Sequence, residues 1–128
     1  MSLRVLIADD DAMIRRTLSS SLARVGFDVC TAASGDQTLR LAEVTPPDIA
    51  LVDLHMPMGG LEIARQLKVR RGNLIFVAIL SGDDGDETQS ACVGAGVDAV
   101  FLKPIALVDL RRRLEAAATM LKKHAAAS

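Results

Sequence analysis

The sequence is poor in aromatic residues, with no tryptophan, no tyrosine and three phenylalanines among 128 residues. Proteins that bind single-stranded nucleic acid use aromatic side chains as stacking platforms, so this scarcity argues against such a site. Charge of one sign is also lacking, because the formal net charge is −1. We therefore expect neither nucleic acid nor a membrane surface as a direct partner.

Cysteines and long apolar runs are few. The two cysteines, Cys30 and Cys92, lie far apart in apolar settings, which is typical of reduced core residues rather than of a disulfide framework. No apolar run is long enough to cross a membrane, and no signal-peptide pattern opens the chain. Half of the residues are hydrophobic, and the length suits one folded unit. The sequence thus predicts a single cytoplasmic domain.

Five apolar runs, rich in β-branched residues or leucine, alternate with helical patterns. Most of the runs are continuous, which is typical of strands covered on both faces. They span residues 3–8, 27–31, 49–52, 74–80 and 99–102. The helical patterns span about residues 14–25, 35–44, 61–69, 86–95 and 107–121. This order predicts an α/β fold, a flavodoxin-like (βα)5 doubly wound parallel sheet with strand order 2-1-3-4-5.

Several residues mark where the predicted helices begin and end. Asp11 stands at the N-cap of the first helix, and Gly26 ends that helix. Ser34 and Gln37 form a capping box for the second helix. The fourth helical pattern is weak, because Gly94 interrupts it and its apolar face is small. We expect the fourth helix to be the element that moves most readily.

Polar side chains follow four of the five predicted strands. Asp9 and Asp10 follow the first strand, Asp53 the third, Ser81 the fourth and Lys103 the fifth. The carboxyl ends of parallel strands meet at one edge of a sheet, and the first and third strands are neighbours in this order. Three converging carboxylates predict a divalent-cation site, for which Mg²⁺ is the best candidate. A hydroxyl and an ammonium beside that site suit a phosphoryl group.

Four segments, VLIADDD, ALVDLHMP, AILSG and GAGVDAVFLKPI, stand at these strand ends. In this order and spacing they resemble the signature segments of the receiver domains of two-component response regulators. The resemblance covers about residues 4–121, the core of one receiver domain that spans residues 1–128. It implies that Asp53 accepts a phosphoryl group from a sensor histidine kinase or a histidine phosphotransfer protein. It implies no enzyme activity beyond self-phosphorylation and self-dephosphorylation.

The resemblance also implies a set of metal ligands. Asp10 and Asp53 would bind Mg²⁺ directly, and Asp9 would act mainly through water. The main-chain carbonyl of His55 would supply a further ligand. We expect the His55 side chain itself to face solvent.

The remaining implied roles concern the phosphoryl group and the signal. Ser81 and Lys103 would bind the phosphoryl oxygens, with a cis peptide bond before Pro104 aiming the lysine inward. Phosphorylation would alter the surface from the fourth helix to the fifth strand. Partners in the family include output domains, other proteins and second copies of the same domain.

Two places depart from the family pattern. The segment MPMGGLEI is one residue shorter than usual and has Gly59-Gly60 without the usual acid, so the loop before the third helix should have an unusual shape. Val100 stands where many members have an aromatic residue that reorients on activation. Its neighbour Phe101 should face the opposite side of the sheet, because side chains alternate along a strand.

Two other functions stay open at this point. The unusual Gly59-Gly60 loop and Val100 suggest a degenerate receiver that acts as a phosphorylation-independent docking module, whereas the intact site residues argue against it. An aspartyl-phosphate phosphohydrolase would need an acid/base aspartate two residues after Asp53, where this sequence has His55. A dinucleotide site is disfavoured, because no G-x-G-x-x-G follows the first strand.

Other charged residues have ordinary interpretations. The acidic run over residues 83–87 is more typical of a solvated loop and helix start than of a second metal site. The arginines at 111–113 predict a solvated helix face. His124 lies near the end of the last helix, and we expect it to be inert.

Overall fold

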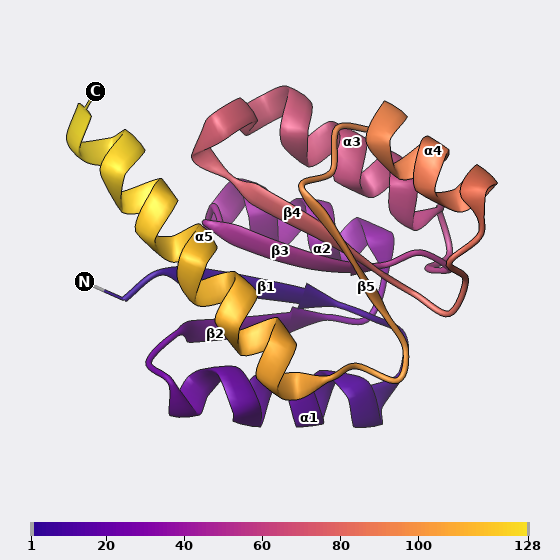
Figure 1. Ribbon diagram of the computed structural model, residues 1–128, viewed down its shortest axis with the longest axis horizontal. Coiled ribbons are helices and arrows are strands. Elements are labelled where there is room, and N and C mark those ends of the chain that lie inside the picture. The colour runs from indigo at the N-terminus through magenta and orange to yellow at the C-terminus, as the bar shows by residue number, and fades with distance from the viewer. Residues whose placement is uncertain (1, 128) are drawn as a thin grey trace.

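The computed structural model describes residues 2–127 and, within them, the side chains of residues 2–125. In this part of the chain five strands alternate with five α-helices, and one 3₁₀ turn precedes the fourth strand (Figure 1). The elements are β1 (Arg4–Ala8), α1 (Ala12–Arg24), β2 (Asp28–Ala32), α2 (Gly35–Val44), β3 (Ile49–Asp53), α3 (Gly60–Arg71), η1 (Gly72–Leu74), β4 (Phe76–Ser81), α4 (Asp86–Gly94), β5 (Ala99–Leu102) and α5 (Leu107–Ala127).

The described strands form one parallel sheet in the order β2-β1-β3-β4-β5. The register pairs Val5 of β1 with Ile49 of β3, and Ile49 in turn with Phe76 of β4. The chain passes from β1 to β2 on one side of β1 and then to β3 on the other side of β1. Because β1 and β3 are parallel neighbours, the loops that follow them lie side by side at the same edge of the sheet. The predicted flavodoxin-like order is confirmed.

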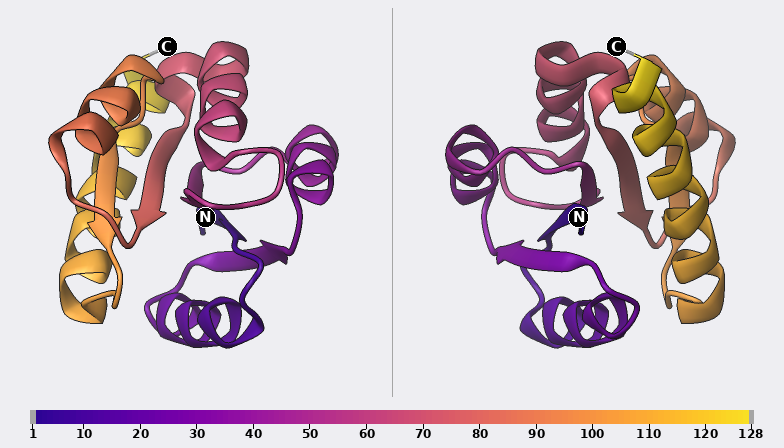
Figure 2. Two further views of the ribbon diagram at one scale, coloured as in Figure 1. Left: turned by 90° about the vertical axis from the view of Figure 1, so that its right-hand side faces the viewer. Right: turned by 90° about the vertical axis from the view of Figure 1, so that its left-hand side faces the viewer.

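Helices cover both faces of the sheet (Figure 2). On one face α1 and α5 contribute buried side chains such as Leu22 and Leu114. On the other face α2, α3 and α4 pack, with Leu67 and Cys92 among the buried residues. Alternate residues of the central strands enter the two apolar layers, which explains why their sequences are continuously hydrophobic.

The weak elements of the sequence are weak in the structure. Within α4, whose residues are all described, Cys92 is the one buried side chain. Along β5, Val100 packs into the layer of α2, α3 and α4, and Phe101 packs into the layer of α1 and α5. The prediction that Phe101 faces away from the side of Val100 is therefore confirmed.

The predicted helix caps form, with one change. Asp11 is the N-cap of α1, and its Oδ1 accepts the N–H of Met13 at 2.9 Å. Ser34 is the N-cap of α2, and its Oγ accepts the N–H of Gln37 at 3.2 Å. Gln37 Oε1 accepts the N–H of Ala33 at 2.8 Å, so the returning bond of the capping box lies one residue before the cap.

Several strand boundaries differ from the prediction by one or two residues, and the local structure explains the starts of β4 and β2. Leu74 lies in η1 and is 52% exposed, and β4 begins at Phe76, because the chain first reverses direction after α3 at Gly72, whose φ is +54°. The second strand begins one residue later than predicted, since the N–H of Phe27 bonds to the carbonyl of Leu22 and closes the end of α1. Apolar character alone does not distinguish such turns from strands.

Three further expectations agree with the structure. The Lys103–Pro104 peptide bond is cis. Cys30 and Cys92 are free thiols, and burial raises the pKa of both. Among the described residues, no helix combines the length and the apolar character that crossing a membrane requires.

Candidate functional site

Three carboxylates meet at the carboxyl edge of the sheet, where β1 and β3 end side by side. Ligand oxygens of Asp9, Asp10 and Asp53 all lie within 4.8 Å of one another. Asp9 is fully buried, Asp53 is 5% exposed, and Asp10 is open to solvent. No second acidic cluster of this kind occurs among the described residues. Closely spaced carboxylate oxygens are the ligands that Mg²⁺ prefers, so the donor set fits this ion.

The Lys103 ammonium lies against the two buried carboxylates. Its Nζ is 3.0 Å from Asp9 Oδ2 and 3.2 Å from Asp53 Oδ1. The residue comes from the end of β5, on the far side of β4 from β3, and its long side chain spans that distance. One ammonium faces three carboxylates, so the cluster keeps a deficit of positive charge that a cation can supply.

Burial dominates the ionisation of Asp9. It raises the pKa of Asp9, and the hydrogen bonds from the Asp11 N–H and from Lys103 offset this only in part, while the charge of Asp53 adds to it. For Lys103, burial disfavours the ammonium, but the hydrogen bonds and charges of Asp9 and Asp53 outweigh burial and raise its pKa. The lysine therefore remains a cation at neutral pH.

The turn after β1 holds Asp9 through several donors. The N–H of Asp11 donates to Asp9 Oδ1 at 2.9 Å, and Lys103 holds the other carboxylate oxygen. Arg15, on the first turns of α1, donates from Nη1 to the main-chain carbonyl of Asp9 at 2.7 Å. Sequence reasoning missed Arg15. The signal available in the sequence was an arginine on the helix that directly follows the acidic turn.

Ser81 lies at the end of β4 and is fully buried. Its hydroxyl donates to the carbonyl of Asp83 at 2.9 Å and accepts the N–H of the same residue at 2.9 Å. The structure thus brings Ser81 to the predicted edge of the sheet, with its hydroxyl engaged by the loop that leads into α4.

The loop between β3 and α3 is tightly folded against Asp53. The exposed His55 donates its N–H to Asp53 Oδ1 at 3.3 Å. The N–H of Gly60 bonds to the carbonyl of Leu54 at 3.1 Å. A Cβ at residue 60 would overlap the carbonyl oxygen of Asp53 and lie 2.8 Å from Leu54 Cα, so this position requires glycine. The shortened segment therefore packs its backbone directly on the predicted phosphoacceptor, which the sequence did not reveal.

The acidic run before α4 is a helix start. Asp83 Oδ1 accepts the N–H of Gly85 at 2.8 Å, and Oδ2 accepts the hydroxyl of Thr88 at 2.7 Å. The backbone bond from Gly85 and then the bond from Thr88 lower the pKa of Asp83. These contacts agree with the ordinary interpretation of residues 83–87.

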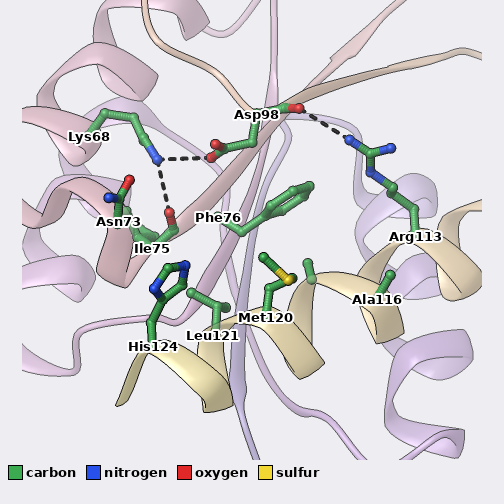
Figure 3. A pocket seen from close by; sticks show the side chains of 11 residues that line it. Lys68, Asn73, Ile75, Phe76, Asp98, Arg113, Ala116, Met120, Leu121 and His124 are labelled. Atoms are coloured by element: carbon green, nitrogen blue, oxygen red, sulfur yellow. Dashed lines mark hydrogen bonds and ion pairs between the residues drawn. The ribbon is translucent and has the colours of Figure 1, made fainter. Parts of the chain in front are cut away.

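A hollow of about 360 Å³ lies at the opposite edge of the sheet (Figure 3). There Lys68 Nζ contacts both Asp98 Oδ2 and the carbonyl of Ile75 at 3.0 Å, and Arg113 donates to the carbonyl of Asp98 at 3.4 Å. The exposed His124 lies on its rim. The hollow lies between α3, the start of β4 and α5. Its charged groups largely pair with one another, so it offers no reactive cluster.

Comparisons with known proteins agree on one family. The family model described as response regulator receiver domain matches residues 5–115. Response regulator MprA of Mycobacterium bovis is 34% identical over 128 residues, which cover 99% of this chain and 55% of that protein. The protein of the same name in Mycobacterium ulcerans is 35% identical over 117 residues, which cover 91% of this chain and 50% of that protein. The chain thus spans about half the length of the curated relatives that it matches.

Solved structures give the same answer for the fold. A CheY-like response regulator receiver domain protein from Methanospirillum hungatei superposes with a TM-score of 0.88 at 27% identity, covering 96% of this chain and 99% of that one. Chemotaxis protein CheY4 of Vibrio cholerae superposes with a TM-score of 0.85 at 25% identity, covering 91% and 99%. With the family match over most of its length, this chain belongs to the response regulator receiver domain family.

Proposed function

We propose that Asp53 is the phosphoacceptor of a two-component phosphorelay. A carboxylate oxygen of Asp53 attacks the phosphorus of a phosphohistidine on a sensor histidine kinase or a histidine phosphotransfer protein. The new O–P bond forms as the N–P bond breaks, and the imidazole leaves with its electron pair. The observation that carries the proposal is the juxtaposition of Asp53 with Asp9, Asp10 and Lys103 at one edge of the sheet.

Mg²⁺ fits the carboxylate cluster as a resident ion. Asp10 and Asp53 would hold it directly, with the main-chain carbonyl of His55 as a further ligand. Asp9 would act mainly through water, because one of its oxygens accepts the Asp11 N–H and the other contacts Lys103. When bound, the ion neutralises charge on the phosphoryl oxygens during transfer.

Lys103 and Ser81 would recognise the transferred group. The Lys103 ammonium already lies 3.2 Å from Asp53 and has only to move to an oxygen of the new phosphoryl group. The Ser81 hydroxyl has to leave the main chain of Asp83, which begins the loop into α4. This exchange of partners links Asp53 to the surface formed by α4 and β5, which we propose as the output surface.

The wider setting follows from the family. We propose a cytoplasmic receiver with its core over about residues 4–121, coupled to an output domain, a partner protein or a second copy. Its chemistry would be limited to its own phosphorylation and dephosphorylation. The Val100 side chain is too small to act as the reorienting aromatic residue of many members, so the exchange at Ser81 would have to carry the signal.

Phosphorylation by a small-molecule donor tests this function. Acetyl phosphate with Mg²⁺ should retard the wild-type band on a phosphate-affinity gel, and Asp53→Asn should abolish the shift. Omission of Mg²⁺ with EDTA present should also abolish it. Asp84→Asn, a change in the exposed acidic run, serves as a matched control and should leave the shift intact. An unmodified wild-type protein would instead favour the docking module without phosphorylation.

A further inference from the structure

We infer that Arg15 is a positioning residue that holds the two acidic residues after β1 in the arrangement that binds Mg²⁺. This inference rests on the proposed function, since it concerns the same metal site. Arg15 does not reach the carboxylates. Its Nη1 donates to the main-chain carbonyl of Asp9 at 2.7 Å, a short distance for a hydrogen bond from a charged donor.

The carbonyl that Arg15 holds belongs to the peptide unit between Asp9 and Asp10. β1 ends at Ala8, so this peptide lies just beyond the last paired residue of the strand. Asp9 itself is buried, and both of its carboxylate oxygens accept hydrogen bonds. The Asp10 side chain is exposed, so packing does not hold it, and the backbone sets the direction in which its Cα–Cβ bond leaves the chain. A clamp on the Asp9–Asp10 peptide therefore orients Asp10 in particular.

The clamp comes from a rigid element. Arg15 follows the N-cap Asp11 by one helical turn, and its own N–H bonds to the carbonyl of Asp11 at 3.1 Å. Because α1 packs Leu18 and Leu22 into the core, the backbone that carries Arg15 is fixed relative to the sheet. Partners that orient metal ligands without touching the metal contribute strongly to metal affinity, and their loss typically weakens it by about 10- to 100-fold.

The charge of Arg15 lowers the affinity for Mg²⁺, whereas positioning by Arg15 raises it. The direction in which the Mg²⁺ affinity changes when Arg15 is removed therefore tests the inference. A guanidinium beside a cation site repels the cation, so removing its charge alone would tighten Mg²⁺ binding. If positioning dominates, removing the side chain weakens binding instead. Arg16, the exposed neighbour on the same helix, carries the same charge and provides a matched control.

The experiment is a Mg²⁺ titration of the intact domain followed by calorimetry and by amide chemical shifts of the turn after β1. The absence of tryptophan and tyrosine makes intrinsic fluorescence a poor reporter. We expect Arg15→Ala to raise the Kd for Mg²⁺ about tenfold or more. Arg15→Lys keeps the charge without the planar fork and should lie between wild type and Arg15→Ala. Arg16→Ala should bind as tightly as wild type or slightly more tightly.

A second readout separates positioning from a loss of stability. At saturating Mg²⁺, phosphorylation of Arg15→Ala by acetyl phosphate should return close to the wild-type rate, with the defect confined to the Mg²⁺ concentration needed. Thermal unfolding in EDTA reports any damage to the fold, and Arg15→Lys covers the case in which alanine is not tolerated. Binding by Arg15→Ala as tight as wild type, or tighter, would overturn the inference and leave the proposed function standing. Failure of the wild type to bind Mg²⁺ would overturn both.

Discussion

At the scale of single residues, the site contains one acid, Asp9, whose ionised form burial disfavours, and burial therefore raises its pKa. Asp9 is fully buried beside Asp53, and the Lys103 ammonium compensates only part of the negative charge. Burial of carboxylates close together destabilises the fold, because each charged form loses hydration and repels the other. This cost falls at the place where we propose that a cation and a phosphoryl group bind.

The raised pKa of Asp9 predicts how stability depends on pH. An acid whose pKa is higher in the folded state than its ordinary value near 3.8 binds its proton more tightly when folded. Its ionisation therefore costs stability as pH rises from about that ordinary value through the folded value. In EDTA, Asp9→Asn should become more stable than wild type over this window, and the difference should level off at higher pH.

Urea unfolding between pH 3.5 and 7.5 measures this difference. Addition of Mg²⁺ should close or reverse the gap, because only the wild type retains all three carboxylates. Taking the difference between the two proteins cancels other carboxyl groups, such as Asp83, whose pKa is lowered and whose contribution has the opposite sign. A gap that shrinks as pH rises would contradict the assignment.

Gly60 gives a second prediction at the residue scale. A methyl group there would overlap the Asp53 carbonyl oxygen, which is backbone and cannot move aside without displacing Asp53. We expect Gly60→Ala to destabilise the domain by about 1–3 kcal/mol, as overpacking usually does, and to slow phosphorylation. Gly94→Ala, where a Cβ meets open space at the end of α4, should leave stability unchanged or slightly raised. Equal effects of the two changes in urea unfolding would be inconsistent with this account.

At the scale of elements, α3, β4, β5 and α5 meet at the edge of the sheet away from the carboxylates. Asp98, just before β5, accepts the N–H of Val77 at 2.8 Å and contacts Lys68 at 3.0 Å on α3. Arg113 on α5 donates to its carbonyl and lies 5.9 Å from the centre of the Phe76 ring. One residue therefore sets the position of β5 relative to three neighbours, and β5 carries Lys103 at its other end.

This junction predicts that Asp98→Ala is destabilising by about 1–3 kcal/mol, since it leaves the partly buried N–H of Val77 without its acceptor. It also removes one of the two acceptors of the Lys68 ammonium, which keeps the carbonyl of Ile75. Asp98→Asn keeps an acceptor for Val77 and should cost less. Glu62→Ala removes an exposed ion pair with Arg65, which solvent screens, and should change stability much less than Asp98→Ala. Urea unfolding at neutral pH ranks the three variants, and a harmless Asp98→Ala would refute the role of the junction.

At the scale of the whole molecule, the proposed function requires a signal to pass from Asp53 to α4 and β5. A hydrogen bond to a charged group contributes about 1.5–3 kcal/mol, whereas moving a two-state equilibrium from 1:99 to 99:1 takes about 5.5 kcal/mol. Ser81 and Lys103 together approach that figure, and a partner that binds only the active form supplies the rest. The low burial of α4 makes it the element that can respond.

Ser81→Ala should therefore uncouple this surface from the site. We expect the variant to be phosphorylated on Asp53, with the amide shifts of residues 83–101 changing much less than in wild type. Thr88→Ala, which loosens the start of α4 without touching Asp53, controls for changes in helix stability. If phosphorylated Ser81→Ala showed the same amide shift changes as wild type, the proposed coupling between Asp53 and residues 83–101 through Ser81 would be wrong.

The sequence by itself determined the topology and the edge at which the site lies. Continuous apolar runs alternating with helical patterns allow essentially one kind of sheet, and the polar residues that follow Ala8, Val52, Leu80 and Leu102 then meet at one edge. Local signals were equally readable where they act within a few residues, as at Asp11, because a cap depends on its immediate neighbours.

Only the tertiary structure decided the contacts that cross the chain or depend on a turn. The bond from Arg15 to Asp9, the fit of Gly60 on the Asp53 backbone, and the links between Asp98 and Lys68 follow from packing and loop shape. The prediction of a strand that begins at Leu74 was wrong for the same reason, since apolar character does not specify the direction in which the backbone runs. Hydrophobic periodicity encodes which face is buried, whereas the orientation of a peptide or a guanidinium is fixed only when distant elements pack together.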